Sequence, residues 1–411
     1  RRADASARAP MVSIDPACQT RSAVCESQHH DRRVQCPRGI PAQVQLPSES
    51  RHRAGGCRGR GGRGRHPPVA VTTPFSPLES AQRIADELLF PTALRTDAGD
   101  QVPRSHLDRL AEEGLYGLVG PTEAGGLAAD PATGLRVVEA LAGGCLTTAF
   151  VWIQHHSALR AVAGSTTPGL RERWLEDMCR GKCRAGIAIV GLRPGAGGVS
   201  ARAVAGGWLV NGEVPWVTGW GMIDVVHMVA LAPGGQAVWA LLDAVESPTL
   251  TCQPLRLVAV NASATVAVRL ADHFVPAERV TAVEPASEWA AQEPRKLRSN
   301  GSLALGVARR CCRLIGPDSA AGTLSAWVDA CRAALDHAAL FDPDSLPAAR
   351  AAASYLAYRA AGDLAVATGS RSVLMEQHPQ RLAREALFLL VAAGRPAIRA
   401  ELRRLFESPP P

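Results

Sequence analysis

The pattern of apolar residues changes twice along this chain, and these changes constrain its fold more than any other feature. From about residue 76 to 185, apolar residues recur at helical spacing, which predicts helices that include 134–144, 147–164 and 168–180. Between about 186 and 282, short apolar runs separated by Gly, Pro and Asn are typical of strands. Helical spacing then returns in the segments 293–315, 323–338, 346–368, 378–392 and 396–407.

This order of segments predicts an α+β fold in three structured parts. We expect an N-terminal helical domain at 76–185, a middle antiparallel β-domain at 186–282 and a C-terminal four-helix bundle at 283–411. A basic tail, predicted to be disordered, occupies residues 1–75.

Three local signals add detail to this outline. Ser76 followed by Pro77 predicts the start of the first helix, because Ser caps helices and Pro suits their first position. Asn211-Gly212, inside the sequence "VNGE", predicts a hairpin turn between two strands. The glycines of "GSLALGVARR" have a helical spacing that favours close helix packing over phosphate binding.

The tail carries the positive charge of the chain. Residues 1–66 hold thirteen arginines and no lysine against five acidic residues. The stretch "HRAGGCRGRGGRGRH" has almost no large apolar side chains, so it cannot bury enough surface to offset the entropy of ordering. An Arg-Gly tail could bind nucleic acid. A disordered extension, or upstream sequence included through a misplaced start, is favoured because Arg replaces Lys almost throughout the chain.

The remaining composition suits a globular protein, since hydrophobic residues make up 46% of the 411 residues. No apolar run approaches the roughly 18 residues of a membrane span. The N-terminus also lacks the apolar core of a secretory signal. The eleven cysteines show no paired C-x-x-C spacing, so we expect reduced thiols, no metal site and a cytoplasmic location.

Tryptophans gather in one part of the predicted β-domain. Aromatic residues are only 4% of the chain, yet Trp208, Trp216 and Trp220 surround the step Thr218-Gly219. Trp suits the wall of a site for a flat ligand, because its ring is apolar and its N–H can donate a hydrogen bond. The alternative is that the three indoles form a core cluster of the β-domain.

Segments that follow one another along residues 76–411 resemble the acyl-CoA dehydrogenase family. "LAEEGLYGLVGPTEAGGL" is similar to the family's Gly-rich helix end, Pro and paired Gly, and "LRPGAGG" stands where the family has Thr-Glu-Pro-Gly-x-Gly-Ser. "GGWLVNGEVPWVTG" is similar to the segment whose Trp-x-Thr or Trp-x-Ser flanks the flavin, and "ADHFVPAERV" to the strand that leaves the β-domain. "HPQRLAREALFLLVAAGRPAIRAEL" is similar to the last helices, where an Arg-Asp pair precedes the catalytic Glu-Gly.

The resemblance implies FAD as cofactor and an acyl-CoA or other acyl thioester as substrate. It implies electron-transfer flavoprotein or oxygen as electron acceptor, and a homo- or hetero-oligomer. In such a protein Trp216 would cover one side of the isoalloxazine ring and Thr218 would meet its polar edge. The implied cofactor contacts are Leu192, Gly195, Ala196, Gly197, Gly198, Trp216, Val217 and Thr218.

The chain departs from the family where the proton acceptor would stand. Ala393, before Gly394, takes the position of the catalytic Glu, so these two residues are implied substrate contacts without a base. Some relatives carry the base on an earlier helix, but Lys296 and Leu297 occupy that place and Glu293 is the nearest carboxylate. Glu385 and Glu401, about two turns from Ala393, are interpreted as solvated charges on helix faces.

Other contacts of the family are also changed. Leu192 and Arg193 stand for the Thr and Glu of the flavin loop, and no Arg-x-x-Phe-Gly segment follows Pro317. The adjacent His155 and His156 have no carboxylate four residues away, so a surface or substrate-channel role is favoured over a metal site.

Three functions therefore remain open. The first is an FAD-dependent oxidoreductase that acts on the CH–CH group of an acyl thioester with a non-standard base. The second is a non-catalytic subunit of a hetero-oligomeric acyl-CoA dehydrogenase. The third is a flavin monooxygenase of the same fold, which needs no glutamate because oxygen attacks the reduced flavin.

Overall fold

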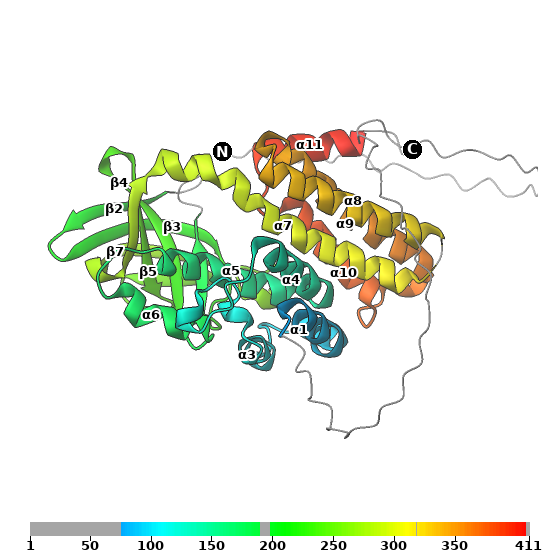
Figure 1. Ribbon diagram of the computed structural model, residues 1–411, viewed down its shortest axis with the longest axis horizontal. Helices are drawn as coiled ribbons and strands as arrows, with labels where there is room; N and C mark the ends of the chain where they lie inside the picture. The colour runs from blue at the N-terminus through cyan, green and yellow to red at the C-terminus, as the bar shows by residue number, and fades with distance from the viewer. Residues whose placement is uncertain (1–74, 190–197, 318, 408–411) are drawn as a thin grey trace, which may run out of the picture. The chain divides into compact units, whose positions relative to one another are not determined.

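Helices from both ends of the chain pack on one another, and the strands of the middle segment form a sheet beside them (Figure 1). The computed structural model describes residues 75–189, 198–317 and 319–407, without the side chains of 290–296, 319 and 320. Helices, then strands, then helices was the predicted order, so the α+β fold class is confirmed. In the described part of the chain, no helix combines the length and the apolarity needed to cross a membrane.

The first N-terminal helix begins where the sequence predicted. The Ser76 hydroxyl caps the first helix by accepting a hydrogen bond from the Glu79 N–H at 3.3 Å. A π-helical turn over Ala85–Leu89 joins this helix to the next. The helices are α1 (Pro77–Ile84), α2 (Phe90–Asp97), α3 (Arg104–Glu112), α4 (Pro131–Gly144), α5 (Leu146–Ala163) and α6 (Leu170–Cys179).

The strands form one sheet in the order β6-β7-β3-β2-β4-β5-β8, and β1 pairs with β4. The strands are β1 (Ala185–Ala188), β2 (Val199–Val204), β3 (Gly207–Val217), β4 (Val225–Ala232), β5 (Gln236–Asp243), β6 (Leu250–Pro254), β7 (Val266–Pro276) and β8 (Val280–Pro285). The sheet is mixed, which corrects the purely antiparallel prediction: β1 and β2 both run parallel to β4. Short apolar runs do not reveal the direction of their partners, so the sequence could not decide this point.

The predicted hairpin turn at Asn211-Gly212 is wrong, because both residues lie inside β3. The turn between β2 and β3 falls instead at Ala205-Gly206, where Gly206 has a φ of +77°. Gly212 is required for another reason: an added Cβ would lie 2.3 Å from the Gly198 carbonyl oxygen. The Asn211 amide donates to the Asp272 carboxylate at 2.9 Å and holds β3 to β7 at this irregular point of the ladder.

The C-terminal helices match the predicted segments except that the first begins seven residues and the second four residues earlier than predicted. The helices are α7 (Ala286–Ile315), α8 (Ser319–Leu340), α9 (Leu346–Thr368), α10 (His378–Val391) and α11 (Pro396–Glu407). α7 begins at Ala286 and not at 293, because its first turns carry polar residues that hide the apolar period. Close packing at the glycines of "GSLALGVARR" is confirmed, since an added Cβ on Gly306 would lie 2.3 Å from the Glu139 carbonyl of α4.

α5 lies between the sheet and the bundle, and it carries the two histidines (Figure 1). Both are buried, which corrects the interpretation of a surface or channel role. His155 Nε2 donates to the Met178 carbonyl at 3.1 Å, and its Nδ1 accepts from the Ala185 N–H at 3.2 Å. His156 Nε2 donates to the Leu115 carbonyl at 3.1 Å. Each histidine therefore satisfies backbone groups of the core, the role that buried polar residues usually have.

Burial makes His156 a source of acid sensitivity. Loss of hydration lowers the pKa of His156 to about 4, whereas the unfolded chain binds this proton near 6.5. Its contribution to stability is thus complete above pH 6.5 and is lost as the pH falls toward 4. We expect His156→Gln to reduce the difference in unfolding free energy between pH 7 and pH 4 by about 3 kcal/mol. Urea unfolding of the parent and of His156→Gln at both pH values measures this, and an equal difference in the two proteins would contradict it.

Candidate functional site

A bulge at the end of β3 presents Trp216 to solvent. Val214 pairs with Val268 and Val217 with Val266, so Pro215 and Trp216 together face one residue of β7. Pro215 has no N–H for the ladder, and a bulge is where a strand tolerates this. Trp216 has a φ of +69°, and 56% of its surface is exposed. A large apolar ring thus stands on a strained backbone outside any core.

The two residues after Trp216 turn back into the protein. Val217 is buried in the core of the sheet. The Thr218 hydroxyl is buried as well, 3.2 Å from the Thr265 hydroxyl, which lies 2.8 Å from the Ser263 hydroxyl. The side chain of Thr218 therefore links the residue after β3 to the residue before β7. Trp208 and Trp220 pack on the same core and support the alternative of a core cluster for these two indoles only.

The short helix η6 (Asn261–Ser263) braces the end of β3. The Gly219 N–H donates to the Ser263 carbonyl at 2.9 Å, and the Trp220 N–H donates to the Ala264 carbonyl at 3.2 Å. Val260 and Ala264, which flank η6, have φ values of +52° and +46°. Non-glycine residues rarely adopt this left-handed region, and a β-branched residue such as Val260 does so least of all. Such strain gathers at functional sites more often than elsewhere.

Four predicted cofactor contacts of the flavin loop lie outside the described residues: Leu192, Gly195, Ala196 and Gly197. Gly198 is described, is exposed and precedes β2, where its carbonyl approaches Gly212 of β3.

Ala393 lies in the turn between α10 and α11. It is half-buried, has a φ of +52° and precedes Gly394, whose N–H donates to the Val391 carbonyl at 3.1 Å. The Arg395 guanidinium donates to the Ala393 carbonyl at 3.2 Å. The side chain at this position is a methyl group, which cannot accept a proton.

Arg384 on α10 ties this helix to the segment that precedes η6. Its guanidinium donates to the Val258 carbonyl at 2.9 Å and forms an ion pair with Asp97 at the end of α2. The N-terminal helices, the η6 segment and the helix that leads to Ala393 are therefore fixed to one another through a single side chain. Sequence reasoning missed this role, because contacts between residues so far apart leave no pattern in the chain.

Glu385, next to Arg384, is buried and not solvated, which corrects its interpretation as a charge on an exposed helix face. Glu385 and Arg381 form an ion pair in which each side chain is 1% exposed. Burial raises the pKa of the Glu385 carboxyl, and the Arg381 guanidinium opposes this only in part. The spacing of four residues between opposite charges was the signal available in the sequence. Glu401, which was also interpreted as a solvated charge, is partly exposed and forms an ion pair with Arg404.

The described residues fit part of a site for a flat apolar ring. The exposed indole of Trp216 offers a wall, and the braced backbone of residues 216–219 offers a rigid edge. No carboxylate stands at the turn of Ala393, and Glu385 is committed to Arg381. The side chain of Glu293 lies outside the described residues. The described part of the chain holds no group of three or more His, Cys, Asp or Glu suited to a metal ion.

Comparison with known proteins agrees with the motifs. Residues 77–182 match the family described as "Acyl-CoA dehydrogenase, N-terminal domain". The 3-sulfinopropanoyl-CoA desulfinase of Variovorax paradoxus is 25% identical over 359 residues, covering 76% of this chain and 89% of that protein. The enzyme of the same name from Advenella mimigardefordensis is 27% identical, over 36% of this chain and 38% of its own length. The structure of glutaryl-coenzyme A dehydrogenase with glutaryl-CoA shares the fold: the TM-score is 0.71 at 17% identity, over 81% of this chain and 95% of that one.

The burial of the Arg381–Glu385 pair can be tested by its energetics. Glu385→Gln leaves the Arg381 charge buried without a counter-ion, so we expect a loss of about 3 kcal/mol or more in unfolding free energy. Replacing both residues, as Arg381→Met with Glu385→Leu, should recover most of this loss. Urea unfolding measures each variant, and Glu401→Gln should change stability by less than about 0.5 kcal/mol. Equal small effects at positions 385 and 401 would contradict the buried pair.

Proposed function

The chain belongs to the acyl-CoA dehydrogenase family, and from this premise we propose that it is an FAD-dependent oxidoreductase that acts on an acyl thioester with a non-standard base. The observation that supports binding of the cofactor is Trp216, an exposed indole held in a left-handed conformation at a bulge of β3. An exposed aromatic ring on strained backbone adds little to folding stability, so contact with a ligand explains it better.

The residues that would hold the cofactor are Trp216, Val217, Thr218 and Gly198, together with Leu192, Gly195, Ala196 and Gly197. Trp216 would cover one face of the ring, and the backbone around Thr218 would meet its polar edge. Glycines at 195, 197 and 198 would let backbone N–H groups approach a phosphate. Bound FAD would supply the capacity to accept hydride from the acyl chain.

Ala393 and Gly394 would line the thioester site without taking part in proton transfer. Loss of a general base typically lowers a rate by about 10²–10⁴-fold. A dehydrogenation that begins with proton removal would therefore be slow in this chain unless another group, such as Glu293, takes over. Relatives named as desulfinases act, by that name, on a CoA thioester bearing a sulfinate, which makes such a substrate a second candidate.

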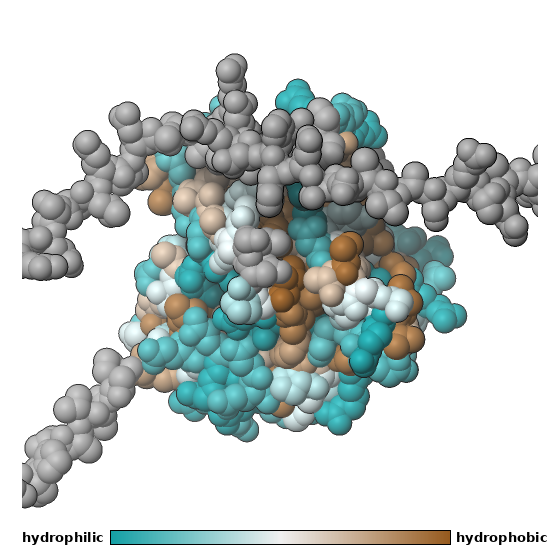
Figure 2. Space-filling view, turned by 90° about the vertical axis from the view of Figure 1, so that its right-hand side faces the viewer, coloured by the Kyte–Doolittle hydropathy of each residue, from teal (hydrophilic) through white to brown (hydrophobic). Residues whose placement is uncertain are grey.

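We also propose that the chain forms an oligomer through the bundle. Large apolar side chains are exposed along the end of α9, the segment after it and α10: Val366, Val373, Leu374, Met375, Leu387 and Val391. Hydrophobic residues also gather on the face drawn in Figure 2. Surfaces of this kind mark subunit contacts. The partner could be a second copy or an intact paralogue, the latter making this chain a non-catalytic subunit. Electron-transfer flavoprotein or oxygen would be the electron acceptor, in the cytoplasm.

The visible spectrum of the purified chain tests the cofactor. We expect a yellow protein with flavin absorbance, and a decrease in flavin affinity of about tenfold in Trp216→Ala, because a ring contact contributes roughly 1–1.5 kcal/mol. Trp327→Ala, at a partly exposed tryptophan of α8, is the matched control. A protein that stays colourless with added FAD overturns the proposal, and flavin uptake only with a partner chain supports the non-catalytic subunit.

The missing base gives a second test. If the chain lacks only a proton acceptor, Ala393→Glu should raise the rate at which an acyl-CoA bleaches the flavin by about 10²-fold or more. The parent should bleach slowly with a simple acyl-CoA. Faster release of sulfite from 3-sulfinopropanoyl-CoA by the parent than by Ala393→Glu would favour the second candidate. Oxygen consumption without any response to thioesters would favour a monooxygenase.

A further inference from the structure

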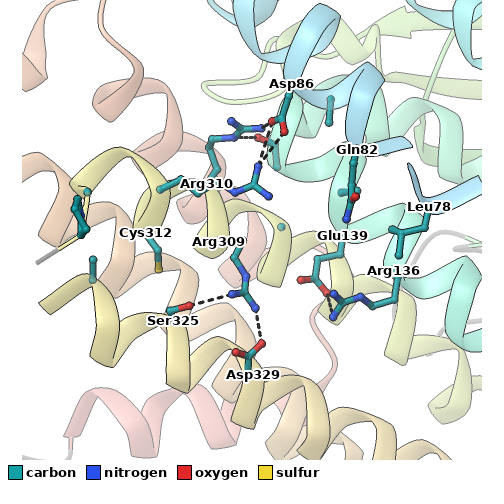
Figure 3. Close-up of a pocket in the computed structure, with 18 of the residues that line it drawn as sticks. Leu78, Gln82, Asp86, Arg136, Glu139, Arg309, Arg310, Cys312, Ser325 and Asp329 are labelled. Atoms are coloured by element: carbon teal, nitrogen blue, oxygen red, sulfur yellow. Dashed lines mark hydrogen bonds and ion pairs between the residues drawn. The ribbon is translucent and has the colours of Figure 1, made fainter. Parts of the chain in front are cut away.

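A charged cavity of about 700 Å³ lies between α1, α4, α7 and α8 (Figure 3). None of its lining residues belongs to the predicted flavin or thioester contacts. Four arginines reach it, Arg136 from α4 and Arg309, Arg310 and Arg313 from α7. The volume is within the range of small-molecule sites, which is roughly 300–1,000 Å³.

The cations of this cavity outnumber its anions. Asp86, Glu139 and Asp329 are its carboxylates. Arg310 and Arg313 share Asp86, while Arg309 and the neighbouring Arg332 share Asp329. Arg332 also holds Glu139. Five guanidinium groups thus meet three carboxylates, which leaves an excess of two positive charges in the described residues.

Two of the arginines keep donors for a ligand. Arg136 reaches Glu139 only at 3.9 Å, beyond hydrogen-bond distance, and is partly exposed. Arg313 donates from one nitrogen, Nη1, to both carboxylate oxygens of Asp86, each at 3.2 Å. A guanidinium has five N–H donors, so each of these two can still bind an anion in the two-pronged way that suits phosphate. The buried Arg310 donates to the Gly143 carbonyl and to Asp86 and fixes one wall.

The helix that carries Asp86 is irregular at this point. Asp86 lies in the π-helical turn Ala85–Leu89, just before Pro91, which cannot donate an N–H to the preceding turn. Turns of this type recur at functional sites. Here the turn places Asp86 against Arg310, as Figure 3 shows, and Arg313 donates to the same carboxylate at 3.2 Å.

We propose that this cavity binds a phosphate-bearing small molecule of about nucleotide size. A phosphate monoester carries close to two negative charges at neutral pH, which suits a lining that holds more cations than anions. Small residues of the wall, Ala321 and Gly322, leave room for the rest of the molecule. Ala321 and Gly322 also lie in the first turn of the 22-residue helix α8. The helix dipole makes the N-terminal end of such a helix partly positive, which favours an anion. The same chemistry could come from a free nucleotide, the phosphates of CoA or the diphosphate of FAD.

Calorimetric titration with ADP, CoA, FAD and inorganic phosphate tests the cavity and distinguishes these sources. We expect binding of ADP that weakens with salt, and a Kd at least tenfold higher in Arg136→Gln with Arg313→Gln, since hydrogen bonds to charged groups contribute about 1.5–3 kcal/mol. Glu139 and Asp86 keep Arg332 and Arg310 in this variant, so folding should be preserved. Arg202→Gln with Arg269→Gln, at exposed arginines of β2 and β7 outside the cavity, is the charge-matched control.

A second variant fills the cavity without removing charge. An added Cβ on Gly322 meets nothing within 4 Å, so Gly322→Leu should fold and occupy the space. We expect it to abolish ADP binding, whereas Gly134→Leu, at an open position of α4 outside the cavity, should bind as the parent does. Unchanged affinity in both cavity variants, or no binding by the parent at low salt, overturns the proposal. Tighter binding of CoA or FAD than of ADP identifies that source. The result does not depend on flavin absorbance or turnover.

Discussion

The close contact between α4 and α7 is the constraint on which the rest of the structure depends. Gly306 lets the α7 backbone approach the Glu139 carbonyl so closely that any Cβ would collide with it, and Arg310 then donates across the contact to the Gly143 carbonyl. This one contact joins helices from the two ends of the chain, far apart in sequence. The contact also fixes the position of three arginines on α7. Arg309, Arg310 and Arg313 lie within about one turn of each other and follow Gly306, so they face the cavity together. The charged cavity is therefore a consequence of how the halves are joined.

A buried ion pair on α10 imposes a second constraint on the structure. Arg381 and Glu385 must pair inside the bundle, because either charge alone would be costly there. Arg384 then faces outward from the pair and binds Asp97 and the Val258 carbonyl, which fixes the segment before η6. Arg381, Arg384 and Glu385 of α10 therefore help to fix both the turn at Ala393, which follows this helix, and the segment that braces the end of β3.

The parts that could be predicted from sequence are those set by local periodicity. The helix predicted at 346–368 is found at Leu346–Thr368, because its apolar spacing is regular and Gly369 ends it. The direction of β1 and β2, the burial of His155 and His156 and the Arg381–Glu385 pair were missed. Each depends on residues distant in the chain. The turn predicted at Asn211-Gly212 was wrong for a related reason. Glycine is needed at position 212 because the Gly198 carbonyl approaches it closely, and not because a turn forms there. At the candidate site, the motif around Trp216 located the feature, but nothing in the sequence indicated its left-handed backbone.

The residues with left-handed backbone conformations bear differently on ring binding and on proton transfer. Trp216, Val260 and Ala264 hold conformations that cost roughly 1–3 kcal/mol each, and the exposed ring of Trp216 returns little of this through packing. A chain that had lost its ligand would gain stability by relaxing them. Ala393 is also left-handed, so the turn itself is kept although its side chain carries no base. The features suited to holding a ring remain, while the group suited to moving a proton does not. This combination supports the proposal of a chain that binds a flavin ring without the usual proton acceptor.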